Sequence, residues 1–128
     1  MKKVLLVIVI FFILVNATFA DESGLIDYKM WEGIKARDPE GYSRAMYIHG
    51  FFDGVELFDS DRYKLLPKNI AVSDYIDQID LFYMDPANRQ IPVGRLLQMA
   101  TLRYISVPDE AINDLLLDLR EEYSGTQP

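Results

Sequence analysis

One histidine and two carboxylates recur at a spacing that can place them on one face of a helix. His49, Asp53 and Glu56 stand at positions i, i+4 and i+7 of an apolar-periodic segment. An imidazole beside two carboxylates can bind a divalent metal or a small ligand, or form an acid–base pair. The spacing matches no zinc motif such as HExxH. The alternative interpretation is a polar edge beside the core-facing stripe of the helix.

A second group of position-specific residues marks a corner between two predicted helices. A proline directly follows Asp85, which favours a turn, and Pro92 suits the first position of a new helix. We predict a structural role, in which Arg89 pairs with Asp85 or Asp80 and Asn88 bonds the turn backbone. The alternative is that Arg89 contacts a ligand or a partner directly.

Two glycines lie four positions apart in the same helix as the histidine. Gly50 and Gly54 each cost up to about 1 kcal/mol relative to alanine in a helix interior. We therefore predict that another backbone packs closely there, either from a neighbouring helix or from a second subunit. The alternative is a locally weak helix.

Motifs of the common enzyme classes are absent from the sequence. There is no cysteine, no G-x-S-x-G and no phosphate-binding glycine loop. No serine, histidine and aspartate stand at a spacing that indicates a catalytic triad. The sequence therefore predicts a non-enzymatic protein, and it implies no cofactor.

Hydrophobic periodicity predicts an all-α fold. Apolar residues recur every three or four positions in five segments, and no segment keeps the alternation of a strand. A small bundle of four to five helices is the expected architecture. A short helix is predicted within residues 21–37, with Ser23 as its cap and breaks at Gly33 and at Arg37-Asp38-Pro39. The other predicted helices span residues 38–58, 73–84, 92–105 and 108–123.

Start signals and apolar stripes refine these elements. Asp38 is predicted to be an N-cap with Pro39 at the first helical position, and Ser73 is predicted to cap the following helix. Trp31 is expected to pack on the domain as an anchor. Phe58 is assigned to the inward stripe of its helix.

The first twenty residues have the layout of a secretory signal peptide. Lys2 and Lys3 precede an apolar run over residues 4–15, and Thr18-Phe19-Ala20 ends in a small residue. The alternative, a retained membrane anchor, requires a longer apolar run. Cleavage after residue 20 would leave one domain over 21–123 and a flexible tail over 124–128. The expected location is periplasmic or secreted, with no membrane contact after cleavage.

The net charge restricts the class of partner, and the cysteine content restricts the source of stability. Loss of the signal segment would leave 11 basic residues against 20 acidic ones, a net charge of about −9. Nucleic acid is not an expected partner, because phosphates attract clusters of Lys and Arg. This charge suits either a basic protein partner or a domain that simply stays soluble through self-repulsion. Without cysteine, stability must come from packing.

The chain resembles the Rap/Tai-like family of periplasmic immunity proteins from type VI secretion systems. The stretch Tyr47-Ile48-His49-Gly50-Phe51-Phe52-Asp53-Gly54 looks like the family's Tyr-Ile-x-Gly-x-x-Asp-Gly/Ala helix. The corner, Phe82-Tyr83-x-Asp85-x-x-Asn88-Arg89-x-Ile91-Pro92-Val93, looks like a motif of small exported bacterial proteins near that family. Many members carry a disulfide, and this chain has no cysteine.

The resemblance implies a small helical protein that binds and blocks a peptidoglycan-cleaving amidase toxin, and it implies a homodimer as one form of the chain. The function expected from the sequence is therefore an exported binding protein, specifically an immunity protein. The alternative is a periplasmic small-ligand or metal-binding domain that uses the face formed by His49, Asp53 and Glu56.

Overall fold

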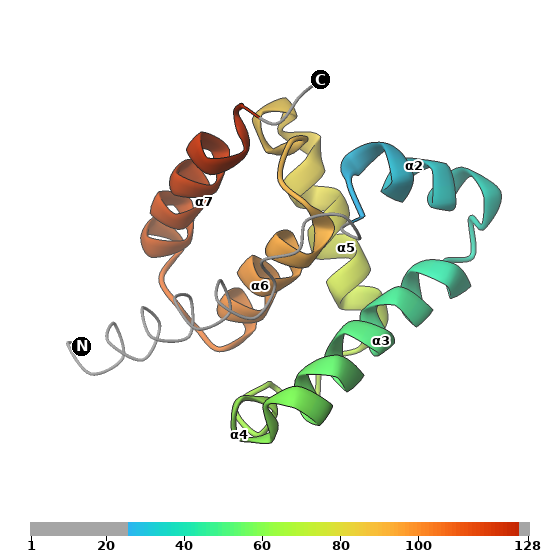
Figure 1. The fold of residues 1–128 in the computed structure, drawn as a ribbon, viewed down its shortest axis with the longest axis vertical. Coiled ribbons are helices and arrows are strands. Elements are labelled where there is room, and N and C mark those ends of the chain that lie inside the picture. Colours follow the sequence, from blue (N-terminus) through green and yellow to red (C-terminus); the bar gives the residue numbers. More distant parts are fainter. Residues whose placement is uncertain (1–25, 126–128) are drawn as a thin grey trace.

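The computed structural model describes residues 26–125, and every regular element in that range is helical (Figure 1). The predicted all-α fold is confirmed, and no strand occurs among the described residues. The predicted signal peptide lies outside them. Within this range no helix is both long and apolar enough to cross a membrane. The elements are α2 (Tyr28–Arg37), α3 (Tyr42–Phe58), α4 (Ser60–Tyr63), α5 (Val72–Met84), the 3-10 helix η2 (Pro86–Asn88), α6 (Val93–Tyr104) and α7 (Asp109–Tyr123).

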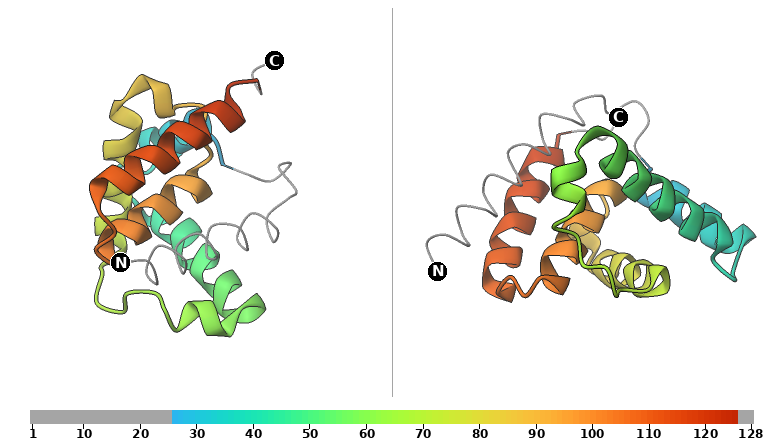
Figure 2. Two further views of the ribbon diagram at one scale, coloured as in Figure 1. Left: turned by 90° about the vertical axis from the view of Figure 1, so that its left-hand side faces the viewer. Right: turned by 90° about the horizontal axis from the view of Figure 1, so that it is seen from below.

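Helix α6 is the centre of the domain. It lies between α7 and α3 in two roughly perpendicular views (Figures 1 and 2), and ten consecutive residues, 93–102, are buried. The sequence indicated only one apolar stripe for this helix. The structure also buries its polar residues Arg95, Gln98 and Thr101, because neighbours cover α6 on several sides. Pro92 is the N-cap of α6 rather than its first residue.

Helices α2 and α3 diverge from a tight link and form one side of the molecule (Figure 1). Asp27 caps α2 by accepting a hydrogen bond from the backbone N of Met30 at 2.8 Å. Trp31 is fully buried, which confirms its predicted role as an anchor. The predicted cap Ser23 and the predicted break at Gly33 are wrong, because α2 is capped by Asp27 and passes through Gly33; it ends at Arg37, where the second break was predicted.

The predicted start of α3 at Asp38 and Pro39 is wrong. The helix begins at Tyr42, after Gly41, whose φ of 86° is the left-handed conformation that glycine tolerates. Asp38 still acts as a cap from a distance, because its Oδ2 accepts from the backbone N of Ser43 at 2.6 Å. The hydrogen bond from the backbone N of Ser43 is the largest of the causes that hold the pKa of the Asp38 carboxyl below its usual value.

The ends of α5, α6 and α7 differ from the prediction by a residue or two. Helix α5 begins at Val72, so Ser73 lies inside its first turn instead of capping it. The carboxylate of Asp74 accepts from the backbone N of Ala71 at 3.3 Å. This contact satisfies one backbone N–H at the start of α5, although it is not the bond that a capping Ser73 would form.

A left-handed residue joins α6 to α7. Ser106 has a φ of 65°, the only positive value for a residue other than glycine in the range 26–125. The backbone N of Val107 donates to the carbonyl of Leu102, and the N of Ser106 donates to that of Arg103, both at 3.0 Å. This pair of bonds is the Schellman motif, which closes a helix and turns the chain.

Candidate functional site

A partly buried ionic cluster fixes α3 against the rest of the domain. Asp80 of α5 accepts hydrogen bonds from Nε1 of Trp31 at 2.8 Å and from Nζ of Lys35 at 2.9 Å. The guanidinium of Arg44, which is 5% exposed, lies 3.1 Å from the same carboxylate and stacks over the Trp31 ring. Three helices, α2, α3 and α5, therefore share one carboxylate.

The cluster stabilises the ionised form of Asp80. Burial opposes ionisation, but the hydrogen bonds from Trp31 and Lys35 and the charges of Lys35 and Arg44 outweigh it. As a result the pKa of Asp80 lies below its usual value. The orientation of α3 is thus fixed by charge as well as by its buried Ile48.

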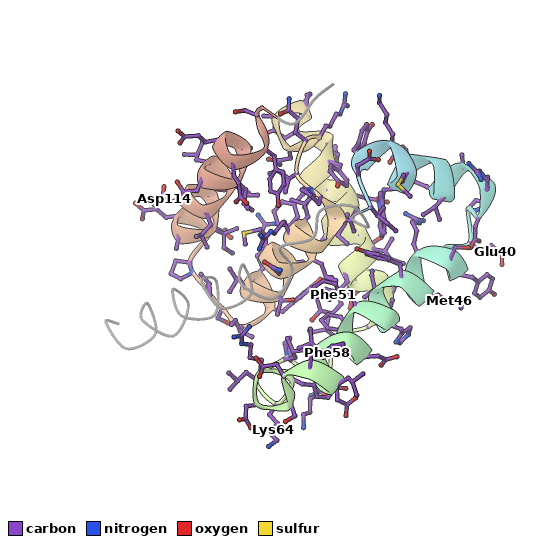
Figure 3. The ribbon with its side chains drawn as sticks, viewed as in Figure 1. Glu40, Met46, Phe51, Phe58, Lys64 and Asp114 are labelled. Atoms are coloured by element: carbon purple, nitrogen blue, oxygen red, sulfur yellow. The ribbon has the colours of Figure 1, made fainter. Side chains whose placement is uncertain are left out.

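The outer side of α3 carries large apolar side chains that no described residue covers. Tyr42 and Met46 near its start are 70% and 74% exposed, and Leu57 and Phe58 at its end are 77% and 79% exposed. Figure 3 labels Met46 and Phe58 toward opposite ends of the helix. The prediction that Phe58 faces inward is wrong, because the helix extends past the body of the domain at this end. The α3 apolar face, as we name it, consists of Tyr42, Met46, Gly50, Gly54, Leu57 and Phe58.

Both glycines of α3 belong to this open face. A Cβ atom built on Gly50 or Gly54 would meet nothing within 4 Å. The prediction that a neighbouring helix packs on them is therefore wrong for the described chain, and a second subunit remains a prediction. The glycine that meets another helix is Gly94 of α6, whose Cβ would lie 3.4 Å from the Phe51 ring. Phe51 fills the space between α3 and α6 (Figure 3).

His49 and Asp53 line an open groove beside this face, with a volume of about 420 Å³. Its opposite wall is the connector from α4 to α5. Glu56 does not line the groove, so the structure brings two of the three predicted residues together and leaves the third apart. The lining residues are His49, Phe52, Asp53, Tyr63, Leu66, Pro67, Lys68, Ile70, Val72 and Tyr75.

The structure does not bring the three predicted metal ligands together. Among residues 26–125 no group of three or more His, Cys, Asp or Glu side chains is placed to hold a metal ion. His49 and Asp53 alone provide too few ligands, because protein zinc sites use at least three. The small-ligand interpretation does not need a third ligand and stays open.

The predicted corner is held mainly by a residue from α7. Nε of Arg120 donates to Oδ1 of Asn88 at 2.8 Å, and its Nη2 lies 2.8 Å from Oδ2 of Asp85. Asn88, which is 3% exposed, also donates to the carbonyl of Phe82 at 2.8 Å. That bond confirms the prediction that Asn88 bonds the turn backbone.

The predicted pairing of Arg89 with Asp85 or Asp80 is wrong. Both carboxylates are paired with other cations, and Arg89 stacks over the ring of Tyr28 at 4.9 Å from its centre. The neighbouring hydroxyl of Tyr83 donates to the carbonyl of Ile91 at 2.8 Å, and burial raises the pKa of Tyr83. The corner therefore joins α5 to α6 through internal hydrogen bonds. Its centre is packed with buried side chains, which leaves little space for a ligand.

Sequence reasoning missed the two arginines that matter most to this architecture. Arg44 stands among apolar residues of α3, and Arg120 stands in the charged last turns of α7. The signal that could have indicated Arg44 is its place within the apolar stripe, two residues after the start of α3 and four before the buried Ile48. Arg120 gave no such signal, because charged residues are common on the outer side of a terminal helix.

Comparison with known proteins adds no relative: no family model, no curated protein and no solved structure matches the chain. Function is therefore argued from the residues and their geometry.

Proposed function

We propose that this chain is an exported, non-enzymatic binding protein that contacts a protein partner through the α3 apolar face. The observation that carries the proposal is the row of exposed apolar residues on α3, from Tyr42 to Phe58, on an otherwise acidic domain. Exposed apolar patches of this kind mark interaction sites more often than chance. Tyrosine, phenylalanine and methionine are also enriched at protein interfaces.

The exposed area of the α3 apolar face is smaller than the area that a standard protein interface buries. A fully buried aromatic side chain covers about 150–250 Å². Together, the four large exposed side chains of the face offer on the order of 500 Å². A standard interface buries about 800 Å² per partner, so the partner also contacts the polar residues beside the face. Gly50 and Gly54 leave a low central strip on which a partner element can approach the α3 backbone.

The charge of the domain favours a basic partner. The net charge of the full sequence is −7, and Asp53 and Glu56 lie exposed beside the α3 apolar face. Opposite charge accelerates association and helps to select the partner. Within this function, we propose the specific form that the resemblance implies: an immunity protein that binds and inhibits a cell-wall amidase toxin in the periplasm.

The test is capture of the partner by the tagged protein lacking residues 1–20. Envelope extract is passed over the protein, and bound proteins are identified by mass spectrometry. We expect one stoichiometric basic protein. If it is a cell-wall hydrolase, its activity should fall to zero at an equimolar ratio. A bound protein whose hydrolase activity persists would reject the immunity form but keep the binding function.

The groove at His49 and Asp53 favours a second candidate function, small-ligand binding. Its volume of about 420 Å³ is within the range of small-molecule sites. This candidate does not depend on the α3 apolar face, and the two functions can be tested separately.

A further inference from the structure

The groove beside α3 has an apolar floor and a polar rim. Seven of its ten lining residues are apolar or aromatic, and nearly all of these are only partly buried. Phe52 and Tyr75 form an edge-to-face pair with ring centres 5.1 Å apart, and Tyr63 closes one side. Binding is favoured when an apolar group of a ligand covers such a floor, because apolar surface is removed from water.

The groove lining includes one acidic and one basic side chain, which come from different segments. Asp53 projects from α3, and Lys68 comes from the connector between α4 and α5. Both are exposed, and neither forms an ion pair or a side-chain hydrogen bond with any residue that the structure describes. His49 stands one turn before Asp53, and it too has no such partner within residues 26–125.

We propose that this groove binds a small zwitterion with an apolar side chain, of the size of an amino acid or a dipeptide. The apolar side chain covers the floor formed by Phe52, Tyr63 and Tyr75. The ammonium group of the ligand pairs with Asp53, and its carboxylate pairs with Lys68, while His49 offers one further hydrogen bond. The proposal rests on the second candidate function; it uses Asp53, which lies beside the α3 apolar face, but none of the residues that form that face.

The charges argue for a zwitterion rather than a simple anion or cation. A ligand with one charge would pair with either Asp53 or Lys68 and would leave the other without a partner. A zwitterion satisfies both. Because the two rim residues are exposed, each ion pair contributes modestly, and the apolar floor supplies most of the affinity.

Four probes separate these contributions in a titration of the purified protein followed by NMR. L-phenylalanine carries both charges and a ring, phenethylamine lacks the carboxylate, 3-phenylpropionate lacks the ammonium, and glycine lacks the ring. We expect L-phenylalanine to shift the resonances of groove residues and to bind about threefold more tightly than either singly charged probe. Glycine should cause no shift at the same concentration.

Variants assign the two rim charges. Asp53→Asn should weaken L-phenylalanine and phenethylamine about threefold and leave 3-phenylpropionate unchanged. Lys68→Met should weaken L-phenylalanine and 3-phenylpropionate about threefold and leave phenethylamine unchanged. Glu56→Gln is the matched control, because Glu56 stands on the same helix outside the groove and should change nothing.

Two results would overturn the proposal. One is the absence of shifts at groove residues with L-phenylalanine up to the limit of its solubility. The other is binding that Asp53→Asn and Lys68→Met leave intact, which would show that the rim does not recognise the charges. Neither result bears on partner capture by the α3 apolar face, so that function would stand or fall by its own test.

Discussion

Trp31 donates its indole Nε1 hydrogen to Oδ1 of Asp80 at 2.8 Å, across 49 positions of sequence. The same carboxylate lies 3.1 Å from the guanidinium of Arg44. Trp31 is in α2, Arg44 in α3 and Asp80 in α5, so one acidic side chain sets how the α2–α3 pair is placed on the domain. The exposure of the α3 apolar face follows from this placement.

Replacement of Asp80 by asparagine should destabilise the protein. Asparagine keeps an acceptor for Trp31 but leaves the charge of Arg44, which is 5% exposed, without its partner. We expect a loss of about 2–3 kcal/mol at neutral pH, below the range for fully buried pairs because Asp80 retains some exposure. Urea unfolding measures the change. Asp77→Asn, on an exposed position of the same helix, is the control and should cost under about 0.5 kcal/mol.

The contribution of Asp80 should also depend on pH. Its pKa is lowered in the folded state, so the stabilisation is fully present above the ordinary value of 3.8. As the pH falls through 3.8 and then through the folded-state pKa, the unfolded chain takes up the proton first and the advantage is lost. The stability difference between wild type and Asp80→Asn should therefore shrink below about pH 4. A difference that stays constant down to pH 2 would contradict this assignment.

At the corner, Arg120→Ala should cost more than Arg89→Ala. Loss of Arg120 leaves the buried Oδ1 of Asn88 without its donor, with an expected cost of about 1–2 kcal/mol. Arg89 only stacks on Tyr28 from an exposed position, and its loss should cost under about 1 kcal/mol. Thermal unfolding of both variants decides the order. The reverse order would restore Arg89 as the structural residue.

Alanine in place of Gly50 or Gly54 should stabilise the monomer. Neither residue has a positive φ, and the new Cβ would meet nothing within 4 Å. Alanine favours a helix interior over glycine by up to about 1 kcal/mol. Calorimetry at several protein concentrations, with light scattering to report mass, measures the effect. Destabilisation that grows with concentration would instead place a second subunit on the α3 apolar face.

Ser106→Gly should raise the stability by about 0.5–1 kcal/mol. Ser106 has a φ of 65°, a conformation that costs a residue with a side chain and does not cost glycine. Ser124 ends α7 with a φ of −65°, so Ser124→Gly is the matched control and should be neutral or slightly destabilising. Equal effects at the two positions would show that the conformation of Ser106 carries no strain.

The helical elements could be predicted where the signals are local. The apolar spacing of α7 and the prolines before α6 and α7 set their limits to within a residue or two. The start of α3 could not be predicted in this way. Asp38 and Pro39 look like a cap and a first helical residue, but Asp38 reaches forward to Ser43 across a left-handed Gly41. An aspartate followed by a proline is typical both of a loop and of a helix start, so the sequence could not distinguish the two here.

The candidate sites depended on pairings that spacing does not encode. Arg120 reaches Asp85 over 35 positions and displaces the predicted partner, Arg89. The groove needs Tyr63 from the end of α4 and Lys68 from the connector between α4 and α5, and the path of this segment follows from packing rather than from any local pattern. His49 and Asp53 were recognised as neighbours because one helical turn separates them, and this is the part of the site that sequence can specify.

The measurement that tests the central claim most directly is partner capture by variants of the α3 apolar face. Met46→Glu places a charge at a position that is 74% exposed, and Leu117→Glu makes the same kind of change on α7, at a position that is 57% exposed. Both variants should fold with unchanged melting temperatures. We predict that Met46→Glu loses about tenfold or more of the captured partner and that Leu117→Glu retains it. Equal capture by the two variants would contradict binding through α3.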